Sequence, residues 1–133
     1  MRVVLDANVF VSAVLSRAGA PARLLERWRA GDFDLVVSEA LLAEVERILK
    51  SDKVVSRVAA GAPTELLSLL REEAELVQDP TEPPPVRSDD PGDDYLIAIA
   101  SAEHAALVSG DDHLLRLAGR APVYTPRDFL DRL

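Results

Sequence analysis

Residues 3–12 read VVLDANVFVS, and this stretch indicates the fold class. Its first three residues form a short apolar run that predicts a buried strand, and this strand stops at Asp6. The following segment, Asn8 to Leu15, has the pattern of a helix. A strand that leads directly into a helix is the first half of a strand–helix–strand unit, so we expect the chain to go on alternating the two elements.

The rest of the chain continues this alternation. Further strands are expected at residues 35–37, 76–77, 106–109 and 123–124, and helices at residues 22–29, 38–50, 54–60, 64–73, 93–105, 113–117 and from 126 onward. Such an order predicts an α/β fold of three layers, α/β/α, with a central, mostly parallel sheet and right-handed crossovers. The 133 residues suit a single domain, residues 1–133.

One segment interrupts the pattern. Residues 79–92 carry five prolines, three of them in a row at Pro83, Pro84 and Pro85. Proline lacks a backbone N–H and clashes inside a helix, so neither a helix nor a central strand is expected there. We predict a long loop in this place. It should not be a domain linker, because the segment after it is too short to fold alone.

Composition excludes several classes of protein. The chain has no cysteine, which rules out disulfides and thiolate zinc sites. The apolar run at the N-terminus ends at Asp6, too early for a signal peptide, and no later run is long enough to span a bilayer. A soluble protein of the cytoplasm, with no membrane association, is therefore expected.

The net charge and the distribution of arginines bear on which ligands the protein can bind. The formal net charge is −8, which argues against a general binder of nucleic acid but suits a site that holds a cation. Thirteen of the fifteen basic residues are arginine, and four of these (Arg17, Arg23, Arg27 and Arg29) lie close together. This cluster is either a solvated helix face or a patch that contacts phosphate or a partner.

Four acids stand where an active site is expected. In parallel sheets the functional crevice lies beyond the carboxyl ends of the strands, at the switch in strand order. Asp6 follows the first strand, and Asp111 stands two residues after the end of the 106–109 strand. Asp94 is in the first turn of a helix, and Glu44 is in the second turn of the helix after the second strand.

Carboxylates gathered in a crevice repel one another, which raises their pKa values unless a cation neutralises them. Magnesium and manganese prefer carboxylate and water oxygens. A divalent ion of this kind lowers the pKa of a bound water and polarises a phosphoryl oxygen. The acids therefore predict a Mg²⁺ or Mn²⁺ site with phosphodiester chemistry.

Each acid also has a plainer explanation, because acids favour helix starts through capping and the helix dipole. Asp93 and Asp94 fit that role, and Asn8 fits it as a cap or as an amide that orients Asp6. Other polar residues are weaker candidates: Asp89 and Asp90 as loop or cap residues, Asp128 as a capping-box acid, Asp112 as a neighbour of Asp111, and His104 and His113 as catalytic groups.

With these residues in view, the chain resembles the PIN-domain nucleases, and within them the group of VapC-like toxins. Four blocks carry the resemblance: residues 3–12, residues 38–45 (SEALLAEV), residues 94–100 (DYLIAIA) and residues 107–115 (LVSGDDHLL). Their acids map to Asp6, Glu44, Asp94 and Asp111, with Asn8 and Ser109 as polar helpers. The ending VYTPRDFL, residues 123–130, also suits the group.

The resemblance implies a function that the residues alone do not reach. It implies Mg²⁺- or Mn²⁺-dependent cleavage of RNA, in which Asp6, Asp94 and Asp111 hold the metal. It also implies the toxin role in a toxin–antitoxin pair, with a cognate antitoxin as partner and a homodimer as the assembly.

The chain departs from the group's pattern at three points. Ser109 replaces the usual threonine and keeps its hydroxyl, and His113 stands where an acid is common. Asp93 beside Asp94 leaves a choice of one residue. The spacing to the Leu-Ile-Ala run favours Asp94 and makes Asp93 the second candidate.

Two other functions compete with the nuclease. Phosphatases of the haloacid dehalogenase type and phospho-receiver domains also place an aspartate after the first strand. Both need a late lysine, whereas the lysines here are Lys50 and Lys53, and the phosphatases need an aspartate at the place of Asn8. The other alternative is a catalytically silent PIN fold that binds RNA or a protein, and the presence of all four acids argues against it.

Overall fold

A central sheet of five strands organises residues 1–133, all of which the computed structural model describes. The strands are β1 (Arg2–Leu5), β2 (Asp34–Ser38), β3 (Glu75–Val77), β4 (Ala106–Val108) and β5 (Val123–Tyr124). Their order across the sheet is β3-β2-β1-β4-β5, and every neighbouring pair is parallel. The expected α/β fold with a parallel sheet is thus confirmed.

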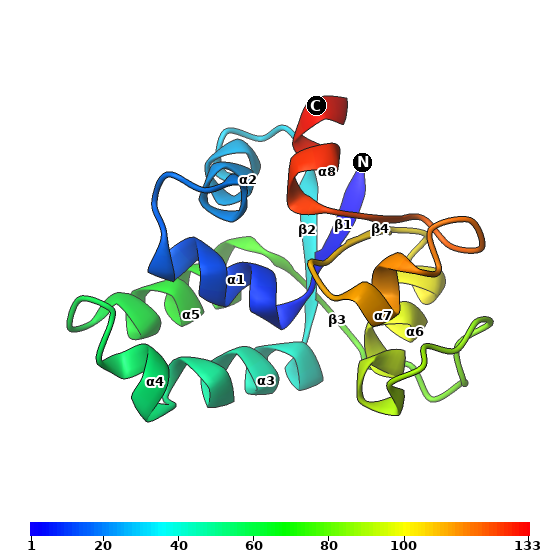
Figure 1. Ribbon diagram of the computed structural model, residues 1–133, viewed down its shortest axis with the longest axis horizontal. Helices are drawn as coiled ribbons and strands as arrows, with labels where there is room; N and C mark the ends of the chain where they lie inside the picture. The colour runs from blue at the N-terminus through cyan, green and yellow to red at the C-terminus, as the bar shows by residue number, and fades with distance from the viewer.

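Helices cover both faces of this sheet. They are α1 (Ala7–Leu15), α2 (Ala20–Arg29), α3 (Glu39–Leu49), α4 (Asp52–Val55), α5 (Ala62–Glu73), the 3₁₀ turn η1 (Pro91–Asp93), α6 (Asp94–Ala102), α7 (Asp112–Leu115) and α8 (Pro126–Arg132). Figure 1 shows α1 to α5 on one side of the sheet and α6 and α7 on the other, with α8 beside α2. None of these helices is both long and apolar enough to cross a membrane.

The strand order locates the functional edge. The chain builds outward from β1 through β2 to β3, then returns to place β4 on the other side of β1. The switch in strand order therefore lies between β1 and β4, and side chains that follow these two strands face the crevice. Asp6 and Ser109 are the residues that directly follow them.

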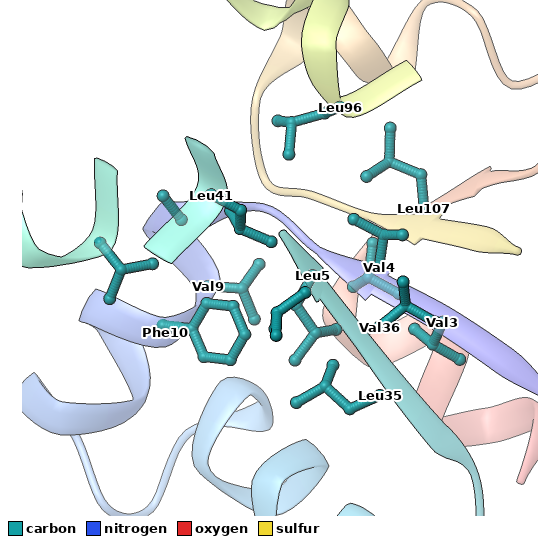
Figure 2. Packing of buried hydrophobic residues seen from close by; sticks show 14 of the residues in the cluster. Val3, Val4, Leu5, Val9, Phe10, Leu35, Val36, Leu41, Leu96 and Leu107 are labelled. Carbon is teal, nitrogen blue, oxygen red and sulfur yellow. The ribbon is translucent and has the colours of Figure 1, made fainter. Parts of the chain in front are cut away.

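Buried apolar side chains on both faces of the sheet hold β1 in place. Val3, Val4 and Leu5 of β1 have no exposed surface, and they belong to a cluster of 31 buried apolar residues. Because side chains alternate along a strand, Leu5 lies on the side of Phe10 and Val4 on the side of Leu96 (Figure 2). Burial from both sides fixes the end of β1, and with it the position of Asp6.

Several predicted boundaries differ from the observed ones. The helix expected at residues 54–60 is one short turn, α4, and the chain then turns through Gly61, whose φ of 87° suits glycine. The helix expected at residues 93–105 ends at Ala102, because His104 adopts a φ of 52° that ends helical geometry. The loop predicted at residues 79–92 is confirmed from residue 79 to residue 90, whereas Pro91 and Gly92 belong to the 3₁₀ turn η1, in whose first position proline is tolerated.

Candidate active site

Asp6 is the innermost acid of the molecule, with 4% of its surface exposed. Its backbone N–H donates to the carbonyl of Val108 at 2.9 Å, which extends the pairing of β1 with β4 by one residue. Its carboxylate Oδ1 accepts from the backbone N–H of Asn8 at 3.3 Å and so caps α1. Burial raises the pKa of Asp6, and the negative charge of Asp111 raises it further.

Ser109 links the two acids at the strand ends. It is fully buried, its Oγ donates to Asp6 Oδ2 at 2.7 Å, and the same oxygen accepts from the backbone N–H of Asp111 at 2.9 Å. The serine hydroxyl therefore fixes the Asp6 carboxylate and the turn that carries Asp111.

Asn8 makes a different contribution from the expected one. Its side chain is exposed, and only its backbone N–H contacts Asp6. Asp6, not Asn8, is the cap of α1. The structure thus gives no hydrogen bond through which the Asn8 amide would orient Asp6.

Asp111 begins the short helix that follows β4. Its Oδ1 accepts from the backbone N–H of His113 at 2.8 Å, and the ring Nδ1 of His113 lies 3.4 Å from the same oxygen. About a quarter of the Asp111 side chain is exposed (26%), so this carboxylate caps α7 and is still accessible from solvent. Its neighbour Asp112 points into solvent.

Asp93 and Asp94 face different surroundings. Asp94 Oδ1 accepts from the backbone N–H of Ser88 at 2.8 Å, and Oδ2 lies 3.5 Å from Nη1 of Arg87. Both oxygens of Asp94 are thus engaged by the proline-rich loop. The carboxylate of Asp93 instead lies against Asp111, so the geometry favours Asp93 over the residue that spacing in the sequence favoured.

Asp93 has a buried oxygen and lies among other acids. Its Oδ2 is buried and accepts no hydrogen bond. Burial, the adjacent Asp111 carboxylate and the charges of Asp6 and Asp90 together raise the pKa of Asp93 to about 7. A buried carboxylate oxygen without a donor is costly, and a cation bound there would remove that cost.

Glu44 joins the group across a small hollow. A pocket of about 240 Å³ is lined by Asp6, Glu44 and Asp93 together with Asn8 and Tyr95. Glu44 has a cationic partner, since its Oε2 accepts from Nε of Arg47 at 3.1 Å. That hydrogen bond lowers the pKa of Glu44, which keeps this carboxylate ionised at the pocket rim.

Sequence reasoning missed Tyr95 as a site residue. Tyr95 lines the pocket together with Asp6, Glu44 and Asp93, and burial together with the charges of Asp6 and Glu44 raises the pKa of its hydroxyl. The residue stands two positions after Asp93 in the first turn of α6. An aromatic residue next to a site acid was the available signal, but its apolar neighbours gave it the pattern of a core residue.

The arginine cluster and Asp89 lie outside this group, whereas Asp90 is close enough for its charge to act on Asp93. Arg27 pairs with Asp32, and Arg29 lies 3.9 Å from Glu73, so two of the four arginines have acidic partners. Asp89 pairs with Arg116 at 3.1 Å. A larger apolar hollow of about 450 Å³ lies between the proline-rich loop, α6 and the segment before β5, and no acid lines it.

The donor set fits a hard divalent cation. Asp6 and Asp93 line one pocket and the Asp93 carboxylate lies against Asp111, so the donors present are carboxylate oxygens, and the buried Oδ2 of Asp93 has no hydrogen-bond partner. Mg²⁺ and Mn²⁺ favour such oxygens, whereas no thiolate is present for a softer ion.

Comparisons with known proteins agree with this fold. The model of the family described as "PIN domain" matches residues 2–113. A search of curated proteins found no match. Among solved structures, the chain is similar to a chain in the crystal structure of VapBC2 from Rickettsia felis bound to a DNA fragment from their promoter. The TM-score is 0.60 at 18% identity, over 93% of this chain and 97% of that one.

A second similar structure is PAE2754 from Pyrobaculum aerophilum. Here the TM-score is 0.64 at 16% identity, and the match covers 99% of this chain and 88% of the other. At these identities the two structures support the fold.

Proposed function

This chain belongs to the PIN-domain family, and from that premise we propose that it is a metal-dependent endoribonuclease that hydrolyses RNA phosphodiester bonds. One observation carries the proposal: Asp6, Asp93 and Asp111 come from three separate segments, Asp6 and Asp93 line one pocket, Ser109 links Asp6 to Asp111, and a buried oxygen of Asp93 has no donor. Neighbouring carboxylates repel one another and destabilise the free protein. The arrangement therefore favours a function in which a cation binds between them.

The residues divide the work between binding and positioning. Asp6, Asp93 and Asp111 are the proposed ligands of Mg²⁺ or Mn²⁺. Glu44 faces them across the pocket, and Ser109 holds Asp6 in place through its hydroxyl. When bound, the ion supplies a water of lowered pKa and a positive charge that neutralises the phosphate.

The acidic surface does not conflict with an RNA substrate. A net charge of −8 repels RNA at long range, so binding depends on the ion and on local basic side chains. Arg47 pairs with Glu44, which lines the pocket, and most of the Arg47 side chain is exposed. Arg47 therefore provides a place where a phosphate of the substrate can bind.

We also propose the toxin role in a toxin–antitoxin pair. Support comes from the similarity to a chain of the VapBC2 complex, which extends over most of both chains. A cognate antitoxin is then the expected partner, a homodimer the expected assembly, and the cytoplasm, where RNA is available, the expected location. A direct check is expression in a host cell, where the wild type should arrest growth and Asp6→Asn should not.

A catalytically silent PIN fold that binds RNA or a protein remains the second candidate. One experiment separates the two: cleavage of a mixed RNA substrate during titration with Mg²⁺ and Mn²⁺, with a chelator as reference. The enzyme requires cleavage that depends on the metal and disappears in Asp6→Asn. Asp112→Asn is the matched control, because Asp112 is an exposed acid on α7 and should keep full activity. RNA binding without cleavage under either metal would favour the silent module.

A further inference from the structure

The apolar hollow of about 450 Å³ lies at the edge of the sheet opposite the candidate acids. Its walls are the end of α6, the proline-rich loop and the first residues of β4 and β5. The acids Asp6 and Asp111 instead follow the carboxyl ends of β1 and β4. The hollow is therefore a second concave surface, separate from the proposed active site.

The floor of the hollow is fixed by the core. It consists of buried apolar side chains with at most 4% of their surface exposed, namely Ile97, Ala105, Leu107 and Val123. Val86 of the proline-rich loop packs against the same core and closes one side. A hollow of this volume with firm apolar walls and a few polar groups is typical of sites for small organic molecules.

Two nitrogen-bearing side chains, His104 and Arg120, give the rim its polar character. Both residues are exposed, and no acid lines the hollow. Arg120 forms no ion pair within the chain, whereas Arg116, four residues before it, pairs with Asp89. In a protein with a net charge of −8, the rim is thus a local region of positive charge.

The backbone at His104 gives no structural reason for an imidazole in this place. His104 has a φ of 52°, in the left-handed region that glycine adopts at lower cost. Its N–H donates to the carbonyl of Ser101 at 3.3 Å, and the N–H of Ala105 donates to the carbonyl of Ala100 at 2.8 Å. A glycine would close this turn equally well, so a role of the ring in binding is the more economical explanation.

The end of α6 opposes an anion at this rim, but it does so weakly. A helix carries only about half an elementary negative charge at its carboxyl end, and the turn at His104 already binds two of the last carbonyls. Arg120 carries a full positive charge and can donate two parallel hydrogen bonds to one carboxylate. Glu103 is held by Arg2 at 2.8 Å and does not line the hollow. The rim therefore favours an anion.

We propose that this hollow binds a small amphipathic organic acid. The apolar body of the ligand fills the space over Ile97, Leu107 and Val123, and its carboxylate binds the guanidinium of Arg120. The ring N–H of His104 is a second donor. Apolar walls select the body, and the unpaired arginine selects the charge. The inference goes beyond the nuclease and does not depend on it, because none of the candidate acids lines the hollow.

The test compares three probes with the same alkyl chain: octanoate, octanol and octylamine. Each is titrated into the full chain below its micelle concentration and followed by the methyl NMR signals of Ile97, Leu107 and Val123. Octanoate should shift these signals and bind at least about 10-fold more tightly than octylamine, although the net charge of the protein favours the amine. Equal binding of all three probes, tighter binding of octylamine, or shifts confined to other residues would overturn the proposal.

Arg120→Gln assigns the carboxylate to its partner. It should weaken octanoate about 10-fold, the usual effect of losing a hydrogen bond to a charged group, and leave octanol unchanged. Arg116→Gln is the matched control, since this arginine is also exposed but does not line the hollow, and it should bind octanoate like the wild type. If Arg120→Gln binds octanoate like the wild type, the assignment is wrong.

Two further variants separate binding from folding. His104→Gly relieves the left-handed backbone, so its melting temperature should equal or exceed that of the wild type while octanoate binds about 3-fold more weakly. Ser101→Phe places a large ring from an exposed position of α6 into the hollow and should weaken octanoate and octanol together. Unchanged binding in both variants, with circular dichroism like that of the wild type, contradicts the proposal.

A second copy of the chain is the other possible occupant of the hollow. Light scattering after gel filtration, with and without octanoate, distinguishes the two. An assembly that stays the same while octanoate binds supports the ligand site. An assembly that dissociates when octanoate is added, or in Ser101→Phe, shows that the hollow is an interface between copies, and the proposal is then wrong.

Discussion

The hydroxyl of Ser109 donates to the carboxylate of Asp6 at 2.7 Å, although 103 positions separate the two residues. Both residues directly follow strands, and β1 and β4 are neighbours at the switch in strand order. The bond is fully buried and joins the two ends that carry the candidate acids. It explains how a carboxylate with little exposure keeps one orientation without a cationic partner.

Ser109→Ala should therefore disturb both the fold and the site. Removing the hydroxyl leaves a buried carboxylate oxygen and the N–H of Asp111 without a partner, which costs about 1–3 kcal/mol of the free energy of unfolding. Because this hydrogen bond lowers the pKa of Asp6, its loss should move Mn²⁺ binding to higher pH. Urea denaturation and Mn²⁺ titration against pH measure the two effects. Ser109→Thr keeps the hydroxyl and is the control; equal stability of all three proteins would contradict the role given to the bond.

Asp93→Asn and Asp94→Asn should differ clearly in the rate at which they cleave RNA. The first removes a proposed metal ligand and should lower the cleavage rate on the order of 100-fold, as the loss of one electrostatic group in an active site does. Asp94→Asn weakens a contact with the proline-rich loop, because both carboxylate oxygens of Asp94 bind that loop. It should leave the cleavage rate within about 3-fold of wild type. The comparison uses single-turnover cleavage at saturating Mn²⁺. The reverse order of effects would restore Asp94 as the ligand.

Without metal, Asp93 should contribute less to the free energy of unfolding as the pH rises from about 4 to 7. The folded state raises the pKa of Asp93 to about 7, whereas an aspartate of the unfolded chain titrates near 3.9. The folded state therefore binds this proton more tightly, and the resulting stability is present below about pH 4 and lost as the pH approaches 7. Asp6, whose pKa is also raised, acts in the same direction.

The effect of Asp93 is measured as a difference between two proteins. The free energy of unfolding of the wild type minus that of Asp93→Asn, both in chelator, should fall between about pH 4 and pH 7 and stay level above that. Saturating Mn²⁺ should remove most of that fall for the wild type, because the ion replaces the proton as counter-charge. A difference that stays constant with pH would show that Asp93 titrates normally.

Asp111→Asn should weaken metal binding and leave the metal-free fold intact. An asparagine still caps α7 by accepting from the N–H of His113, and the exchange removes a charge that acts on Asp6 and Asp93. In chelator its melting temperature should equal or exceed that of the wild type. Asp111→Ala also loses the cap and should be less stable by about 1 kcal/mol. A markedly lower melting temperature of Asp111→Asn without metal would mean that the acid is structural.

The sequence by itself determined the layers of this protein and the edge at which its acids gather. Short apolar runs and amphipathic runs differ in period, and a parallel sheet brings the residues after β1 and β4 to one crevice whatever their separation along the chain. Asp6, Ser109 and Asp111 could be predicted for that reason. The short extent of α4 could not, because a single turn depends on packing more than on local preference.

Only the tertiary structure distinguishes the surroundings of Asp93 from those of Asp94, and on that difference the proposed choice of Asp93 rests. Adjacent residues at a helix start point in directions that differ by about 100°, so a shift of one residue changes which carboxylate faces the crevice. The Ser88 N–H and the Arg87 guanidinium of the proline-rich loop bind the carboxylate of Asp94. The carboxylate of Asp93 accepts no hydrogen bond from this loop and lies against Asp111. The place of Tyr95 in the pocket and of His113 beside Asp90 follows in the same way, because contacts between distant segments are set by packing and not by local sequence.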